Sequence, residues 1–482
     1  MRIKTFILFI LALLGCIAYI SMPLGPFDSR LFDAGIIVAI ISVVIFFNYS
    51  QHSPLKGYWI RPSILFLIGF FAVNFQYLAD YRFGLKSDGS RMILIGEILN
   101  HCMLLGVVGI LSFVAGYVFK PIRENIPLND TITYGKVNIP TSFLVVLNVV
   151  VFVAFLLTID IVSFVSGADY GNAERVNSHF EGLLYVSNAL IVCNVCIKSA
   201  GQTTFKQYIK SFPTISLIVI LLYMVMRLLS GDRGPFIYTM LLLVFGYAYS
   251  TRNKIKLRRV LIYLFSAAIL ISVVGIARSL ELSQRFHQRM GSAFEMFTEE
   301  GRFGERGERT VSPLTEEMGF SFLVNQTDVN AIERKGEKLN YGLYTVTEVV
   351  SSIPFMPSFL QNTLGMPEEK FSSSGFANYH YFGGYERNWG IGTTIVGDFY
   401  LQFGVWGVLI GLFITGLFFR FLDINLYCRE KTLLGAYTIL LVILFSAKSI
   451  YMPRAMLTVE LPRFVIGSII LFALGVRKKK VS

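Results

Sequence analysis

Residues 260–277 read VLIYLFSAAILISVVGIA and contain no charged side chain. Two further stretches, residues 36–47 and 145–157, are equally free of charge. Of the 482 residues, 54% are hydrophobic and 15% are charged, whereas an average soluble domain has about 25% charged residues. A soluble helix keeps one polar face, but these segments are apolar on every face. They are therefore predicted to cross a lipid bilayer.

Segments of this kind recur along the whole chain. A bilayer core requires about 20 apolar residues per helix, and the sequence predicts about 12 such helices. They lie near residues 5–22, 33–49, 62–80, 93–119, 141–160, 181–198, 212–230, 235–250, 260–278, 395–419, 433–451 and 463–476. The predicted fold class is an all-α polytopic membrane protein.

Basic residues indicate how these helices are oriented. If the N-terminus is cytoplasmic, Lys and Arg concentrate in the connections on the cytoplasmic side, as the positive-inside rule requires. Both termini are then predicted to be cytoplasmic. The same bias accounts for the net charge of +12, so no nucleic-acid partner is needed to explain it.

One long connection divides the chain into three parts. Residues 1–278 are predicted to form the first nine transmembrane helices, residues 279–394 a large periplasmic or extracellular loop, and residues 395–482 the last three helices. So long a loop is uncommon unless it has a function.

The end of this loop, residues 376–392, reads FANYHYFGGYERNWGIG. Its aromatic side chains either stack on sugar rings or anchor the loop at the bilayer interface, where aromatic residues are enriched. Both interpretations stay open for Tyr379, His380, Tyr381, Tyr385 and Trp389.

Arginines gather near the predicted outer ends of the helices. A charged side chain near the bilayer is costly and therefore a functional candidate. Guanidinium groups bind phosphate and pyrophosphate bidentately and stay charged at physiological pH. Lipid-headgroup contacts or internal ion pairs, such as one between Arg233 and Asp232, are the alternative. The candidates are Arg227, Arg233, Arg278, Arg285 and Arg289.

Two pairs of polar residues are predicted to share a helix face. Glu97 and His101 are four residues apart in the fourth segment, where they either perform acid–base chemistry or fix helix packing. Asp398 and Gln402 have the same spacing at the start of the tenth segment. Asp398 is the preferred carboxylate for activating a hydroxyl, with a structural salt bridge as the alternative. No His, Asp and Glu set has metal-ligand spacing and no P-loop is found, so neither a metal nor a cofactor is expected.

Two stretches resemble the Wzy-type family of bacterial oligosaccharide repeat-unit polymerases, which build O-antigen. The first is Ser230-Gly231-Asp232-Arg233-Gly234, similar to a small-Gly-x-Arg-Gly pattern of that family. The second is residues 390–407, GIGTTIVGDFYLQFGVWG, similar to a run of glycines, an acidic residue, an aromatic residue and Phe-Gly-x-x-Gly. Asp398 stands where the family commonly has glutamate, which keeps a carboxylate there.

The resemblance implies a C-type glycosyltransferase-like fold in the bacterial inner membrane. It implies transfer of a growing glycan from undecaprenyl pyrophosphate to a new lipid-linked repeat unit, without a metal, at the outer leaflet. Arg233 and Arg278 would neutralise the pyrophosphate and Asp398 would take the hydroxyl proton, in preference to Glu97 and His101. Other polysaccharide-assembly membrane proteins are expected partners besides the lipid bilayer. The expected substrate-binding residues are Arg227, Arg285, Arg289, His380, Tyr385, Arg387, Trp389 and Tyr400.

Two other functions share many of these features. A ligase that transfers finished polysaccharide would use the same donor and the same arginines. A flippase or transporter for lipid-linked sugars is a second alternative, but transporters usually show internal symmetry and polar residues near the midplane. Neither feature is found in this sequence.

Overall fold

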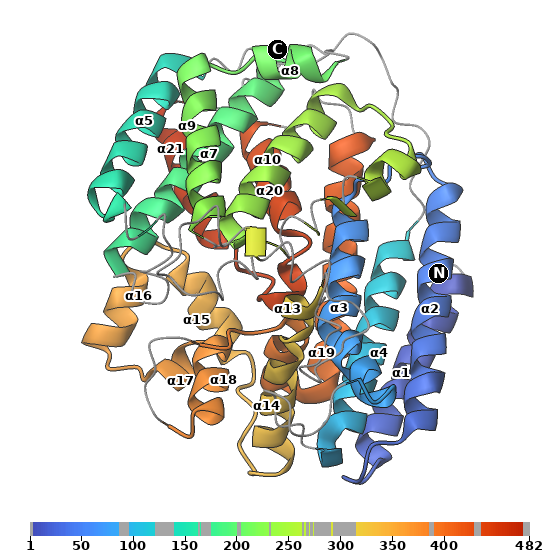
Figure 1. Cartoon of the computed structure of the whole chain (residues 1–482). Coiled ribbons are helices and arrows are strands. Elements are labelled where there is room, and N and C mark those ends of the chain that lie inside the picture. Colours follow the sequence, from blue (N-terminus) through green and yellow to red (C-terminus); the bar gives the residue numbers. More distant parts are fainter. Residues whose placement is uncertain are drawn as a thin grey trace.

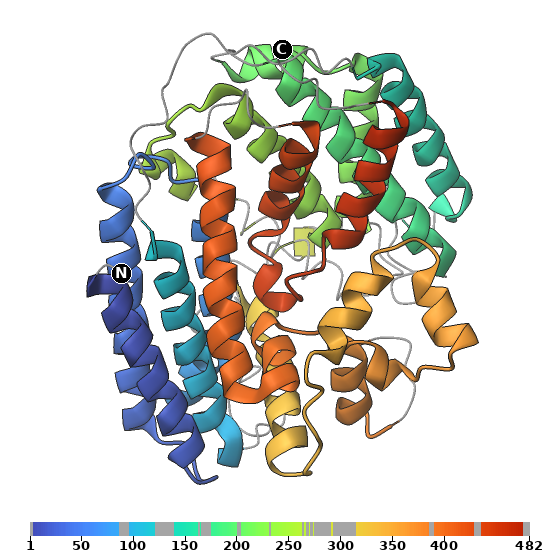
Figure 2. The same cartoon turned by 180° about the vertical axis from the view of Figure 1, so that it is seen from behind.

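The structure is a bundle of helices (Figures 1 and 2). This computed structural model describes residues 3–85, 96–120, 139–161, 164, 175–199, 204–230, 233–262, 265–266, 269, 273, 291–292, 315–384, 390–428 and 435–475. Within these ranges, every regular element is helical.

Many of the helices are long and apolar. The candidates for membrane spans include six long helices: α1 (Ile3–Ser21), α2 (Ser29–Gln51), α3 (Pro62–Arg82), α4 (Leu99–Val118) with the preceding turn η1 (Gly96–Ile98), α7 (Arg175–Lys198) and α19 (Ile395–Tyr427). Shorter apolar helices are α5 (Thr141–Leu157), α9 (Thr214–Leu229), α20 (Ala436–Lys448) and α21 (Leu461–Ala473). The short α8 (Phe205–Lys210) precedes α9, and α10 (Arg233–Thr251) follows it.

These helices agree with the predicted polytopic α-helical class. The predicted segment 260–278 lies largely outside the described residues, as does much of residues 279–314. The number of about 12 spans and the three-part division therefore remain predictions.

Helix α4 forms the centre of one half of the bundle. Each of its residues is buried, because α1, α2, α3 and α19 pack around it. Two glycines allow α4 and α19 to approach closely. A Cβ at Gly116 would collide with the Phe413 carbonyl oxygen, and one at Gly416 with the Phe113 carbonyl oxygen. Small residues at such crossings let membrane helices pack backbone to backbone.

The other half of the bundle contains α5, α7 and α9, and α10 and α20 pack against α7. A buried amide fixes α5 to α7: Asn148 Nδ2 donates to Ser187 Oγ (2.9 Å) and to Asn188 Oδ1 (2.8 Å). Within a membrane no water is present to bond these amide groups, so hydrogen bonds between helices satisfy them.

Short helices lie together at one end of the bundle, here named the loop end (Figures 1 and 2). They are α13 (Glu316–Gly319), α14 (Phe322–Glu333), α15 (Leu343–Ser351), α16 (Met356–Ser358), η2 (Phe359–Thr363), α17 (Glu368–Phe371) and α18 (Ser373–Tyr381). The turn η4 (Met452–Arg454) joins α20 to α21. The opposite end, where α8 lies in Figures 1 and 2, is named the basic end: Lys198 ends α7, Lys206 and Lys210 lie in α8, and Arg252 and Lys254 follow α10.

Candidate active site

Helix α19 is broken near its start, and the break organises the loop end. Phe403 and Gly404 leave the helical conformation, and Gly404 has φ 64° and ψ −151°, a region open essentially to glycine alone. The carbonyls before a helix break lose their partners within the helix. Here they accept hydrogen bonds from the loop: Asn340 N donates to Leu401 O and Tyr341 N to Gln402 O, both at 2.9 Å.

The Gln402 side chain sets the position of α15 against α19. Its Oε1 accepts from the Thr345 hydroxyl (2.6 Å) and from the Thr345 backbone N–H (3.2 Å). Its Nε2 donates to the Asp398 carbonyl at 3.3 Å. The predicted relation of Asp398 and Gln402, four residues apart on one helix, is therefore present, and it connects α15 to the first turn of α19.

The start of α19 is tied to α14. Thr394 is the N-cap residue, and its hydroxyl accepts from Gly397 N at 2.9 Å. The same hydroxyl donates to Asn325 Oδ1 of α14. Gly397 leaves room for Asp328 of α14, because a Cβ at this position would collide with the Asp328 carboxylate.

These contacts bring three carboxyl groups together. Asp328 of α14 is 0% exposed, Asp398 of α19 is 3% exposed and Glu348 of α15 is 9% exposed. Among the residues that the structure describes, both Asp328 oxygens, Asp398 Oδ1 and Glu348 Oε1 have no hydrogen-bond partner. Buried polar atoms are normally paired, so unpaired ones mark a site that needs an explanation. We name these three residues the carboxyl cluster.

Burial changes the protonation of the two loop members of this cluster. It raises the pKa of Glu348 to about 8, and the nearby Asp398 carboxyl acts in the same direction. Burial, and again Asp398, holds the pKa of Asp328 well above its ordinary value. Glu348 is therefore mainly neutral at pH 7. Within the described ranges, no group of three or more His, Cys, Asp and Glu side chains is arranged to hold a metal ion.

A group of basic residues lies at the loop ends of α20 and α21. Lys448 Nζ is 3.7 Å from Glu460 Oε1 and 3.1 Å from the centre of the Tyr238 ring. Arg463 Nη1 donates to the same Glu460 oxygen at 2.6 Å. Two cations around one carboxylate leave this group with a net positive charge.

The basic group is connected to the carboxyl cluster. Thr458, in the segment between α20 and α21, donates its hydroxyl to Glu348 Oε2 at 2.7 Å. Lys448, Glu460 and Arg463 were not among the predicted site residues. A signal was present, because Lys448 and Glu460 are charged residues next to apolar segments.

Of the predicted arginines, Arg233 and Arg227 lie within the described residues. Arg233 begins α10 and is partly exposed. Arg227, near the end of α9, forms an ion pair with Glu181, which also accepts from Tyr223 Oη at 2.5 Å. The Arg227 guanidinium lies 4.7 Å from the Phe164 ring centre. This is the internal ion pair that the sequence left open as an alternative to substrate binding.

Glu97 and His101, which were predicted to share one helix face, have different partners. Glu97 lies in η1, before α4, and its carboxylate is 3.3 Å from Arg334 Nε. His101 Nε2 donates to the Met22 carbonyl at 3.1 Å, and its ring packs on Tyr19 at 4.7 Å between ring centres. The turn at η1 turns Glu97 toward α14, away from the predicted common face.

Tyr400 and His380 also have internal partners. Tyr400 Oη donates to Glu333 Oε1 at 2.7 Å and accepts from Tyr19 Oη at 2.8 Å. His380 Nε2 is 3.9 Å from Glu337 Oε1. The remaining predicted site residues lie outside the described residues: Arg278, Arg285, Arg289, Tyr385, Arg387 and Trp389.

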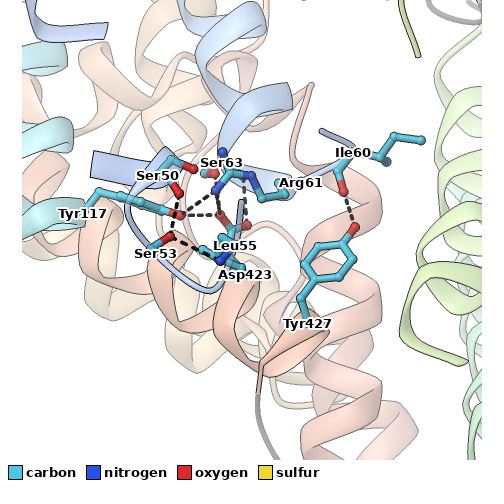
Figure 3. Close-up of polar contacts among 9 residues, drawn as sticks. All are labelled: Ser50, Ser53, Leu55, Ile60, Arg61, Ser63, Tyr117, Asp423 and Tyr427. Carbon is cyan, nitrogen blue, oxygen red and sulfur yellow. Dashed lines mark hydrogen bonds and ion pairs between the residues drawn. The ribbon is translucent and has the colours of Figure 1, made fainter. Parts of the chain in front are cut away.

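A second buried acid occupies the basic end of α19 (Figure 3). Asp423 Oδ2 accepts from the Ser63 hydroxyl at 2.5 Å and from the Tyr117 hydroxyl at 2.6 Å. Arg61 Nη1 lies 3.9 Å from the same oxygen. This carboxylate has its hydrogen bonds and a counter-charge, as expected of a structural contact.

Comparison with known proteins places this arrangement in a family. No curated protein and no solved structure matches the chain. The model of one family, described as O-antigen polysaccharide polymerase Wzy, matches residues 3–480. The match contains both stretches that suggested the resemblance, residues 230–234 and 390–407. This multi-pass membrane protein therefore belongs to the Wzy family of O-antigen polysaccharide polymerases.

Proposed function

We propose that this protein polymerises oligosaccharide repeat units carried on undecaprenyl pyrophosphate, at the outer leaflet of the bacterial inner membrane. The family membership supports polymerisation. The observation that carries the chemistry is the buried, incompletely paired Asp398 at the start of the broken helix α19. We assign the chain to the C-type glycosyltransferase-like class with about 12 spans.

Asp398 is assigned as the general base. In the proposed step, the hydroxyl of an acceptor sugar attacks the anomeric carbon of the donor glycan. The bond from that carbon to the pyrophosphate oxygen breaks, and Asp398 accepts the hydroxyl proton. The products are a longer glycan on the acceptor lipid and free undecaprenyl pyrophosphate. Glu97 and His101 are less suited as the base, because Glu97 pairs with Arg334 and His101 is bonded to the Met22 carbonyl.

Cationic side chains are assigned to the leaving pyrophosphate. Arg233 and Arg278 keep the roles that the resemblance implies, and Arg387 assists. Lys448 and Arg463 join them, because Thr458, which donates to Glu348, lies two residues before their shared partner Glu460. Fixed positive charge stabilises the charge that develops on a leaving group, which makes a metal-independent reaction feasible.

The orientation follows from the distribution of charge. Lysines and arginines gather at the basic end, which we assign to the cytoplasm together with both termini. The loop end then faces outward and meets the lipid-linked substrates. Other polysaccharide-assembly membrane proteins are proposed partners, because they would handle the same lipid-linked substrates.

The test is the size distribution of cell-surface glycan in a strain deleted for this gene. A ladder should collapse to a core carrying a single repeat unit and return with the intact gene. Arg233→Ala should fail to restore the ladder at a normal protein level. Arg30→Ala, an exposed arginine at the same end of the bundle, should restore it.

The outcome also separates polymerase from ligase. Loss of a ligase leaves long chains attached to the carrier lipid, whereas loss of a polymerase leaves single units. An unchanged ladder in the deleted strain would remove the proposed function. A full ladder with Arg233→Ala would remove only that arginine from the mechanism.

A further inference from the structure

The middle of the long loop has an unusual composition. Residues 339–366 contain one charged residue, Glu348. Charged stretches flank this segment on both sides, at residues 333–338 (ERKGEK) and 368–370 (EEK). A loop that is surrounded by water would spread charged residues over its exposed positions.

The helices of this segment expose their apolar side chains. The exposed residues are Leu343 (37%), Val346 (59%), Val349 (45%), Ile353 (50%), Phe355 (88%), Phe359 (45%) and Leu364 (60%). On α15, the polar Thr347 and Glu348 are instead buried. Apart from Thr345, which is bonded to Gln402, the exposed side of α15 is apolar, whereas a helix on a soluble protein turns its polar face outward.

The turn between α15 and α16 repeats this pattern. Phe355, the most exposed of these large apolar residues, follows Pro354 and has φ 71°. A bulky side chain at positive φ is rare, and glycine would fit there without strain. A phenylalanine at the tip of a water-exposed turn would have no favourable contact. In an apolar surrounding, transfer of the ring out of water would be favourable.

The position of α15 and α16 in the bundle fits an apolar surrounding. In Figures 1 and 2, α15 and α16 lie just beyond the loop ends of α5 and α21. α9, in the same half of the bundle, exposes a row of apolar residues that includes Ile215, Ile218, Leu222 and Val225. Exposed apolar residues on a membrane helix face lipid, and the exposed apolar residues of α15 and α16 are of the same kind.

We propose that residues 343–364 form an interfacial helical hairpin that is inserted into the adjacent leaflet, with lipid acyl chains covering its apolar face. Amphipathic helices lie in the interface in this way when their apolar face is wide and exposed. Glu348 lies on the inward face of this hairpin. The carboxyl cluster, to which Glu348 belongs, then lies near the boundary between lipid headgroups and acyl chains. The proposal depends on the membrane location of the bundle and not on polymerisation.

The test is the accessibility of a nitroxide label in vesicles of phosphatidylethanolamine and phosphatidylglycerol. Labels are placed at Phe355→Cys and, separately, at Val346→Cys, in protein carrying Cys428→Ser. The other native cysteines are buried. Two reference positions are Ile218→Cys, exposed on the membrane helix α9, and Lys338→Cys, exposed in the charged flank of the loop.

Oxygen dissolves in lipid and a nickel chelate stays in water, so the ratio of the two accessibilities reports depth. Labels at positions 355 and 346 should match position 218, with a ratio severalfold above that of position 338. Ratios equal to that of position 338 would overturn the hairpin. The surface-glycan ladder of each variant is measured in parallel, so a failure of the hairpin is distinguished from a failure of the polymerase assignment.

Discussion

Helix α19 buries an aspartate at each end, and the two carboxyl groups have opposite surroundings. At the basic end, Asp423 accepts hydrogen bonds from Ser63 and Tyr117 and lies beside Arg61 (Figure 3). At the loop end, Asp398 lies near the Asp328 and Glu348 carboxyl groups. Ser373 and Gln402 form hydrogen bonds with its side chain, but its Oδ1 has no partner within the described ranges.

We interpret this difference as one between a structural carboxylate, Asp423, and the proposed general base, Asp398. Burying a carboxylate is costly unless partners replace the water that it loses. Asp423 has such partners, which hold α3 and α4 against α19. Asp398 lacks a complete set, so a different requirement must account for its burial. Transfer of a proton during the reaction is such a requirement, because a saturated carboxylate would be a poor base.

Replacing Asp398 tests the functional end and should have the largest effect. Asp398→Asn keeps the shape of the side chain but removes the base, so polymer formation should fall by roughly 10²–10⁴-fold. Thermal stability of the purified protein should stay equal or rise, because an incompletely paired carboxyl is removed. Glycan assays and thermal unfolding in detergent check both. Near-normal polymerisation would contradict the assignment of Asp398 as base.

Replacing Asp423 should produce the reverse result. Asp423→Ala leaves Arg61, which is 2% exposed, without its carboxylate. The free energy of unfolding should decrease by about 3–5 kcal/mol. Polymer formation per folded molecule should be unchanged. Asp423→Asn is the milder control, because its amide oxygen still accepts from Ser63 and Tyr117. An Asp423→Ala protein as stable as the natural one would show that this contact is dispensable.

The break in α19 can be tested with Gly404→Ala. The backbone conformation of Gly404 should make alanine unfavourable by about 1–3 kcal/mol. If the helix straightens instead, the carbonyls of Leu401 and Gln402 lose the bonds from the loop, and polymer formation falls. Gly25→Ala is the matched control, since a Cβ there meets nothing within 4 Å. Equal thermal stability of the two variants would mean that the break does not depend on glycine.

The last prediction concerns the pH dependence of stability. The pKa of Glu348 is raised from 4.5 to about 8 in the folded protein. Between these pH values the folded protein keeps a proton that the unfolded chain loses. The contribution of Glu348 to stability is therefore present at low pH and decreases as pH rises, by at most about 1.4 kcal/mol per pH unit.

Glu348→Gln removes this dependence and still accepts from Thr458. The difference in melting temperature between variant and natural protein should therefore change steadily from pH 5 to pH 8, in favour of the variant at the higher pH. A difference that is constant with pH would mean that Glu348 is not a buried neutral acid.

Much of the fold was predictable from local sequence. Uncharged runs such as residues 36–47 and 145–157 became α2 and α5, because lipid accepts only helices whose backbone bonds are internal. Asp398 was also identified correctly as a residue in the first turn of a long helix. Its place among the glycines of residues 390–407 provided the signal.

The contacts of the other candidates were not predictable. Arg227 carries the same charge as Arg233, but Glu181 lies 46 positions earlier in the chain and no local pattern connects the two. Glu97 does not lie on the predicted helix face, because it belongs to the turn η1 that precedes α4. Asp328 and Glu348 carried no motif of their own. They become relevant only where α14 and α15 pack against α19.

The sequence by itself determined that this chain is a membrane-spanning helical protein, and its two short motifs indicated its family. Both depend on residues that are neighbours along the chain, where hydrophobic length and glycine spacing act locally. Only the tertiary structure decided which charges are satisfied and which are left without partners. That outcome depends on the break at Gly404 and on packing between distant segments. These bring Asp328, Glu348 and Asp398 together while Asp423, on the same helix, receives its counter-charge.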